Sequence, residues 1–163
     1  MLISFVLMHE LDLVKIGLIE KRELNEEFFN EVYPGKGIAS EEDTEMAIKL
    51  GLDGVIVSNH GGRQLDAGQS TIKTLHPIVE KYKGQIKIMM DSGIRTGPDI
   101  ARTIASGAEF AFLGRSFMYA VAALGDEGGD HLISSLKVQL KQVMDQVCCS
   151  KIEELPSFLV NPS

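Results

Sequence analysis

Residues 37–58 read "GIASEEDTEMAIKLGLDGVIVS" and residues 93–114 read "GIRTGPDIARTIASGAEFAFLG". These two stretches decide the fold, because the second repeats the first at an offset of 56 residues, the difference between positions 93 and 37. The identical pairs are Gly37 and Gly93, Ile38 and Ile94, Asp43 and Asp99, Ile48 and Ile104, and Gly51 and Gly107. Each copy predicts a loop, a helix, a glycine stop and a strand. Repeated β/α units with short turns favour parallel strands and right-handed crossovers, which a barrel sector and an open doubly wound sheet both satisfy.

Three apolar runs, at 53–58, 86–91 and 109–114, predict buried strands. They lack polar alternation, which favours a parallel sheet that is covered on both faces. Ser40 with Asp43 is a capping-box pattern for the helix of the first copy, and Pro98 fits the first turn of a helix that runs to about residue 106. Further helices are predicted up to residue 32, near 115–124 and near 131–147.

Length and charge bound the function. The chain has 163 residues and predicts one domain over 1–163, in which residues 1–35 stay unassigned. A net charge of −7 disfavours general nucleic-acid binding. No apolar run is long enough to span a membrane, and no Cys/His spacing suggests a metal. Adjacent Cys148 and Cys149 are interpreted as free thiols in a reducing cytosol, so we expect a cytoplasmic protein.

The loops that follow the predicted strands carry the chemistry. They read "NHGGRQLD", "SGIRTG" and "GRSF", and they lie at carboxyl ends of strands, the edge that holds the site in barrels and open parallel sheets alike. Gly93 and Gly114 let the backbone approach a ligand, and the following helices offer unpaired N–H groups. Arg95 and Arg115 add guanidinium groups that suit phosphate oxygens. Together these loops predict one phosphate site.

His60 and Arg63 predict a reaction site beside the phosphate. A histidine can accept a proton near neutral pH, and an arginine can hold a carboxylate through two parallel hydrogen bonds. Gly61 and Gly62 keep the turn free of obstructing side chains. Asp91 ends the second strand and either accepts hydrogen bonds from ligand hydroxyls or caps the next turn. Lys36 either places a cation over an electron-rich ring or is solvated.

The motifs "SNHGGRQLD", "DSGIRTGPDIARTIASGA" and "FLGRSFMYAVAALGDEGG" closely resemble the carboxyl-terminal half of the FMN-dependent 2-hydroxy-acid oxidases and dehydrogenases, the family of glycolate oxidase and L-lactate oxidase or dehydrogenase. The resemblance runs from about residue 36 to about residue 160. It implies an α/β fold, half of a TIM (β/α)8 barrel with parallel strands, and FMN at the carboxyl-terminal face. A full barrel needs roughly 250 residues, so we expect this chain to need a missing half.

The resemblance also implies roles for single residues. His60 is the base that takes the substrate hydroxyl proton, and Arg63 clamps the substrate carboxylate. Hydride transfer and carbanion formation at the substrate carbon both stay open as the order of events. The residues implied around FMN are Lys36 and Ser58 on the first unit, Asp91, Gly93 and Arg95 on the second, and Gly114 and Arg115 on the third. Lys36 would stabilise negative charge at the N1–C2 carbonyl edge of the flavin.

Several expected family features are not found in the sequence. The flavin-binding early strands, the active-site tyrosines, a second substrate arginine and the aspartate that orients the histidine are not recognised in residues 1–35. In "YPGKGIAS" the turn and the lysine of the family run together, which predicts that the strand carrying Lys36 is deleted.

Three hypotheses of function follow from the sequence and the resemblance. The first is oxidation of an L-2-hydroxy acid of lactate or glycolate type to the 2-oxo acid. The second is an inactive fragment that keeps a half-barrel binding FMN or phosphate, and the third is a non-catalytic scaffold module. Open strand edges predict a homo-oligomer or pairing with a complementing amino-terminal half.

Overall fold

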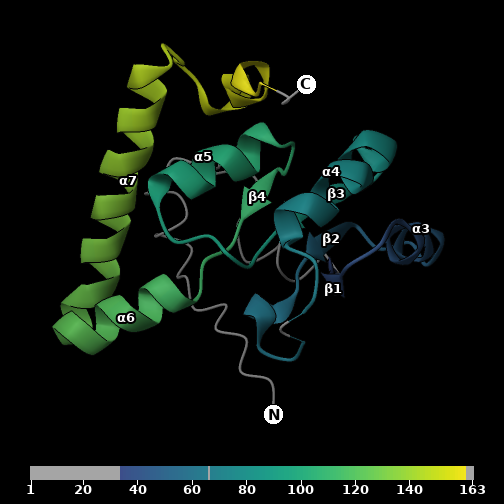
Figure 1. The fold of residues 1–163 in the computed structure, drawn as a ribbon, viewed down its shortest axis with the longest axis horizontal. Helices are drawn as coiled ribbons and strands as arrows, with labels where there is room; N and C mark the ends of the chain where they lie inside the picture. Colours follow the sequence, from purple (N-terminus) through teal and green to yellow (C-terminus); the bar gives the residue numbers. More distant parts are fainter. Residues whose placement is uncertain (1–33, 66, 161–163) are drawn as a thin grey trace.

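The computed structural model describes residues 34–65 and 67–160, and the helix predicted up to residue 32 lies outside them. Four strands form one parallel sheet in the order β1-β2-β3-β4 (Figure 1). They are β1 Pro34–Ile38, β2 Gly54–Val57, β3 Lys87–Met90 and β4 Phe110–Ala111. The helices are α3 Glu41–Lys49, α4 Thr71–Tyr82, α5 Gly97–Ala105, α6 Arg115–Leu124 and α7 Gly128–Gln146. Three 3-10 turns complete the elements: η1 His60–Gly62, η2 Gly125–Glu127 and η3 Ile152–Phe158.

The strand order identifies the type of α/β fold. Neighbouring strands follow one another along the chain, with helices between them, and the order never reverses. A doubly wound sheet reverses its strand order at a switch point, whereas a β/α barrel does not. The described strands thus have the order of consecutive strands in a barrel, and the fold is a partial (β/α)8 barrel with parallel strands.

The repeat of the sequence is a repeat of the structure. Both bounds of α3 and both bounds of α5 differ by the same offset as the two sequence copies. Ser40 accepts a hydrogen bond from the Asp43 amide at 3.1 Å, as the capping pattern predicted. Gly51 and Gly107 follow the two helices with φ of 73° and 100°, a region that side chains disfavour. The glycine stops that the sequence predicted are thus confirmed.

Asp99 closes the amino end of α5. Its Oδ2 accepts hydrogen bonds from the Thr96 hydroxyl at 2.8 Å and from the amides of Thr96 and Arg95 at 3.0 and 3.1 Å. Burial acts to raise the pKa of Asp99, but these hydrogen bonds and nearby Arg102 outweigh burial and lower that pKa. Asp99 is therefore held as a carboxylate that is committed to the loop between β3 and α5.

The core lies between the sheet and its helices. Every residue of β2 is buried, as expected for a strand covered on both faces. Side chains alternate along each strand, so Val55, Val57 and Ile88 join the helices in the main core. Ile56, Met89 and Phe110 lie opposite one another on adjacent strands and form a second buried row. In Figure 1, α7 runs along one side of the molecule, where it contacts α5 and α6.

Two features differ from the sequence prediction. The strand carrying Lys36 is present, so the predicted deletion is wrong: residues of "PGKGI" themselves form β1, and Lys36 pairs with Ile56 of β2. The helix α4 was not assigned, although Leu75 and Ile78 on it are fully buried. Pro77 hides this helix in the sequence, because proline inside a helix usually predicts a break.

Candidate active site at the carboxyl ends of the strands

Three loops meet at the carboxyl edge of the sheet. The sheet hydrogen bonding continues one residue past the strands, because the Ser58 amide donates to the Ile38 carbonyl and the Asp91 amide donates to the Val57 carbonyl. The loops that follow therefore leave the sheet side by side. They carry His60 and Arg63 after β2, Asp91 to Arg95 after β3, and Gly114 and Arg115 after β4.

His60 and Arg63 contact each other directly. The Arg63 guanidinium lies 2.9 Å from His60 Nε2. A guanidinium can only donate hydrogen bonds, so Nε2 is the acceptor if this contact is a hydrogen bond. Within residues 34–65 and 67–160, no carboxylate accepts a hydrogen bond from Nδ1. The structure thus pairs a histidine with a cation that can bind an acid.

The backbone at His60 is held by side chains. Its φ is 56°, in the left-handed region, and its amide donates to Ser58 Oγ at 3.1 Å. The next residue is held through both of its backbone polar groups, since the Gly61 amide donates to Ser92 Oγ at 2.9 Å and the Gly61 carbonyl accepts from Arg115 at 2.7 Å. A Cβ on Gly61 would lie 2.7 Å from the Arg115 guanidinium and would displace that side chain, and the φ of 71° at Gly61 itself favours glycine.

Asp91 is the centre of a polar chain that crosses the strands. Its Oδ1 accepts from the Ser92 hydroxyl at 2.6 Å, and its Oδ2 lies 3.8 Å from Lys36 Nζ. Lys36 lies on β1, two strands away, so the sheet brings together Lys36 and Asp91, which are far apart in sequence. Lys36 is exposed, and Asp91 is only partly accessible.

The two helix ends at this edge are not equivalent. The amides of Arg95 and Thr96 are taken by Asp99, and the Gly97 amide donates to Gln139 Oε1 at 2.8 Å. The prediction that both helices offer unpaired amides is therefore wrong for α5. In the described part of the chain, no side chain caps α6, whose first residue is Arg115. An anion at this edge would meet the amino end of α6, where the helix dipole is positive.

The surroundings of that helix end suit a phosphate. A Cβ added to Gly93, Gly114 or Gly62 would meet no described atom within 4 Å, so the loop backbone borders open space. Arg115 uses one nitrogen for Gly61 and keeps its other donors. Arg95 folds back onto the Ile94 carbonyl at 2.8 Å, and the Ser116 hydroxyl donates to the Arg95 carbonyl at 3.2 Å. Ser116 thus joins the two loops that were predicted to share a phosphate.

Ser92 and Ser116 were not singled out from the sequence. Each hydroxyl joins two loops, which is a property of the folded chain only. One signal was available, because Ser92 directly follows Asp91 in a segment predicted to leave a strand end.

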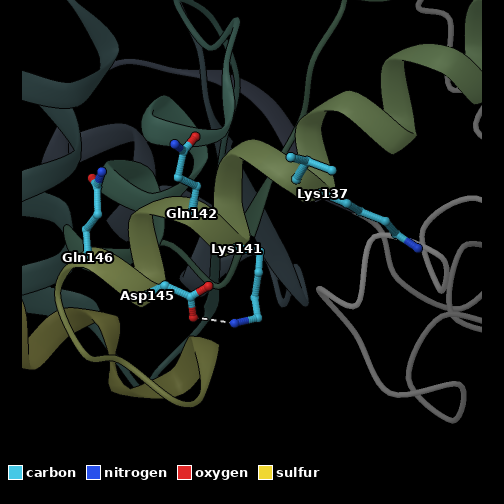
Figure 2. Close-up of a pocket in the computed structure, with 6 residues that line it drawn as sticks. Lys137, Lys141, Gln142, Asp145 and Gln146 are labelled. Carbon is cyan, nitrogen blue, oxygen red and sulfur yellow. Dashed lines mark hydrogen bonds and ion pairs between the residues drawn. The ribbon is translucent and has the colours of Figure 1, made fainter.

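A hollow lies elsewhere, on the outer side of α7. It is lined by Lys137, Val138, Lys141, Gln142, Asp145 and Gln146, and Lys141 pairs with Asp145 (Figure 2). All six residues come from one helix, and none belongs to the loops at the strand ends. Among the described residues, no cluster of side chains suits a metal ion, and no helix has the length and apolar character needed to cross a membrane.

The structure places a histidine, an arginine beside it and an uncapped helix end at one edge of parallel β/α units, which is the edge that holds the site in β/α barrels. Residues 35–162 match the FMN-dependent dehydrogenase family. The match covers most of the chain, which therefore belongs to this family. The class of protein and the family thus agree with the resemblance seen in the sequence.

Relatives in bacteria support the same assignment. The chain is 46% identical to the L-lactate dehydrogenase of Alcaligenes faecalis over 125 residues, which are 77% of this chain and 33% of that protein. It is 46% identical to the L-lactate dehydrogenase of Vibrio cholerae serotype O1 over 120 residues, 74% of this chain and 32% of that protein. The chain thus spans about a third of the length of these relatives.

Solved structures share the fold. A structure of (S)-mandelate dehydrogenase matches with a TM-score of 0.75 at 40% identity, covering 80% of this chain and 37% of that chain. Mandelate oxidase with benzoyl-formic acid matches with a TM-score of 0.73 at 35% identity, covering 76% and 37%. The matched region again is a little over a third of the neighbour.

Proposed function

We propose that this chain contributes the carboxyl-terminal half of a site that oxidises an L-2-hydroxy acid of lactate or glycolate type to the 2-oxo acid with FMN. The observation that carries the proposal is the His60–Arg63 pair at 2.9 Å, placed at the strand edge beside the open end of α6. The family match and the L-lactate dehydrogenase relatives support the reaction class.

In this proposal His60 is the base. Its Nε2 takes the proton of the substrate hydroxyl, for which a histidine is suited near neutral pH. Arg63 leaves Nε2 when a substrate carboxylate offers it a stronger, charged acceptor. FMN, when bound, supplies the acceptor for the hydrogen and the two electrons of the substrate carbon. The chain's own residues thus bind the acid, orient it and remove one proton.

The residues proposed for FMN lie on three loops and one strand. Gly93 and Gly114 border open space at this edge, and we assign the phosphate to the amino end of α6 with Arg115 and Arg95 as its cations. Asp91 and Lys36 form a charged pair further along the same edge, and Ser58 holds the His60 amide. In this proposal Lys36 faces a developing negative charge on a ring, and Asp91 accepts hydrogen bonds from ligand hydroxyls.

Arg115→Ala should weaken FMN binding by about 1.5–3 kcal/mol, the contribution of a hydrogen bond to a charged group, which is roughly a 10- to 150-fold rise in Kd. The variant also removes the donor to Gly61, so binding is measured with inorganic phosphate as well as FMN, by calorimetry. The control is Arg102→Ala, which removes the same charge from the exposed side of α5. Equal affinity of Arg115→Ala and the unchanged chain for both anions would refute the assignment.

A non-catalytic half-barrel that binds FMN or phosphate is the second candidate function. It is favoured by one observation, the lack of a described carboxylate on His60 Nδ1, because an unpositioned base loses much of its effect. A flavin absorption spectrum of the purified chain with FMN and L-lactate separates the two. Bound flavin that is never reduced, even with an amino-terminal half present, supports the binding module.

We also propose that the sheet edges take part in assembly. In residues 34–65 and 67–160 no further strand pairs with the outer edge of β1 or β4, and open edges favour pairing. The helix α6 exposes Met118, Tyr119 and Val121 by 62%, 65% and 51%, an apolar surface of the kind found at interfaces. The expected partner is a second copy or a complementing amino-terminal half.

The chain should therefore form a dimer or larger species when it is alone, and a 1:1 complex when an amino-terminal half is added. Light scattering coupled to size exclusion measures the mass in both cases. Met118→Glu places a charge on the exposed face of α6 and should shift the equilibrium toward the monomer. A monomer at high concentration that also ignores the added half would contradict the proposal.

A further inference from the structure

Ser92 has a backbone conformation that its residue type disfavours. Its φ is 72°, and it is one of three non-glycine residues with positive φ in the described chain. Glycine adopts this conformation without strain, and Gly93 follows with φ of 78°. A glycine in place of Ser92 would relieve the backbone strain. The contacts of the Ser92 side chain are therefore the place to look for what offsets this strain.

The Ser92 hydroxyl joins two loops at the site. It accepts from the Gly61 amide at 2.9 Å, so its own proton is free to go to Asp91 Oδ1, which lies at 2.6 Å. The Ser92 carbonyl accepts from the Thr71 hydroxyl at 3.2 Å, which anchors the turn to α4. The hydroxyl is thus fixed from both sides and can hold the Gly61 peptide in one position.

The Gly61 peptide directly follows His60. No helix or strand hydrogen bond holds this segment, apart from the single turn closed by Gly62 and Asn59. Its position depends on side chains: Ser58 holds the His60 amide, Ser92 the Gly61 amide and Arg115 the Gly61 carbonyl. Among these, Ser92 is the contact that reaches the Asp91–Lys36 pair.

We propose that Ser92 is a positioning residue: its hydroxyl bridges Asp91 and the Gly61 amide and so fixes His60 relative to the charged pair of Asp91 and Lys36. The inference deepens the proposed function and rests on it for the role of His60 as the general base. Ser92 touches neither the substrate nor the reacting atoms in this view. It acts by restricting where the His60 imidazole can lie.

Two variants separate the hydroxyl from the backbone conformation. Ser92→Gly removes the hydroxyl and the strain together, whereas Ser92→Ala removes the hydroxyl and keeps the strain. If the hydroxyl only stabilises the strained turn at Ser92, the Ser92→Gly variant should preserve the loop, because glycine has no strain to offset. Only the Ser92→Ala variant, which keeps the strain without the hydroxyl, should then disturb the loop. If the hydroxyl positions the loop, both variants should release the Gly61 amide to a similar degree.

The first measurement uses the chain without FMN. Nuclear magnetic resonance should show the Gly61 amide exchanging with solvent about 10-fold faster in both variants, as expected for the loss of one hydrogen bond. The ¹⁵N shifts of the His60 ring should change in both variants as Nε2 loses its fixed contact with Arg63. Unchanged Gly61 exchange and unchanged His60 shifts in Ser92→Gly would overturn the proposal.

The chain offers a matched control for strain. Cys148 is exposed at the carboxyl end of α7 with φ of 57°, so Cys148→Gly relieves the same kind of conformation at a distance from the site. Its effect on the free energy of unfolding shows what relief of strain alone does. Cys148→Gly should leave the Gly61 and His60 signals in place, and movement of those signals would count against the inference.

The second measurement uses the complemented, FMN-loaded assembly. Ser92→Gly should lower kcat by about 10- to 100-fold, because small displacements of a catalytic group are costly, while the Kd for FMN stays within about twofold. If the unchanged assembly oxidises no 2-hydroxy acid, the proposed function fails, and the exchange data still decide the role of Ser92. If the assembly is active and kcat of Ser92→Gly is unchanged, the positioning role is refuted.

Discussion

His60→Ala is expected to abolish 2-hydroxy-acid oxidation in the FMN-loaded assembly, with a fall of about 10²- to 10⁴-fold in kcat, the usual contribution of a general base. The reason is that in the proposed function His60 Nε2, which lies beside Arg63, takes the hydroxyl proton. Anaerobic bleaching of the flavin band with L-lactate or glycolate measures the reductive step alone.

The same experiment defines what the chain does by itself. The isolated chain with FMN should show no appreciable flavin reduction, because the Nδ1 side of His60 is not held by a described carboxylate. Adding the amino-terminal half of a related enzyme should restore some reduction, which His60→Ala then removes. The control is His131→Ala, an exposed histidine on α7. Rapid bleaching by the isolated chain, or restored activity that survives His60→Ala, would contradict the assignment.

Gly97→Ala should destabilise the fold by about 3 kcal/mol, near the upper end for overpacking. Gly97 is buried at the start of α5, and an added Cβ would lie 2.4 Å from the Leu140 amide nitrogen and 2.5 Å from Gln139 Cβ. Both neighbours belong to α7, and a backbone atom cannot rotate away, so the two helices must move apart. Urea unfolding followed by circular dichroism measures the free energy of unfolding.

Gly129→Ala is the control for this prediction. Gly129 lies in α7, and an added Cβ there would meet no described atom within 4 Å. Replacing a helical glycine with alanine should stabilise by roughly 0.5–1 kcal/mol, since alanine loses less backbone entropy on folding. If both variants unfold at the same urea concentration as the unchanged chain, the close packing of α5 on α7 is not what the structure indicates.

The periodic parts of the fold were predictable from local sequence. The structure has strands β2, β3 and β4 within the predicted ranges 53–58, 86–91 and 109–114. The predicted helix near 115–124 coincides with α6. Apolar runs and capping residues report local preferences, so these assignments needed no tertiary information. The helix α4 and the strand β1 were not predicted, because their local sequences show no clear helix or strand pattern. Pro77 and the glycines of "PGKGI" obscure the local pattern, and packing overrides it.

The sequence by itself determined the parallel β/α units, and it predicted the edge of the candidate site and the residues His60, Arg63 and Arg115 on its loops. The repeat, the positions of the glycines and the charged residues can all be identified from the sequence. Parallel strands bring their carboxyl ends to one edge, so the position of the loops follows from the predicted strands. The tertiary structure alone decided which of these residues touch. In the structure Asp99 caps the amino end of α5, and no described side chain caps α6. Contacts between side chains and backbone join Lys36, Asp91, Ser92 and Gly61 into one polar chain. Such contacts depend on distances across strands, which are set by sheet register and helix packing. Local sequence patterns do not predict these distances.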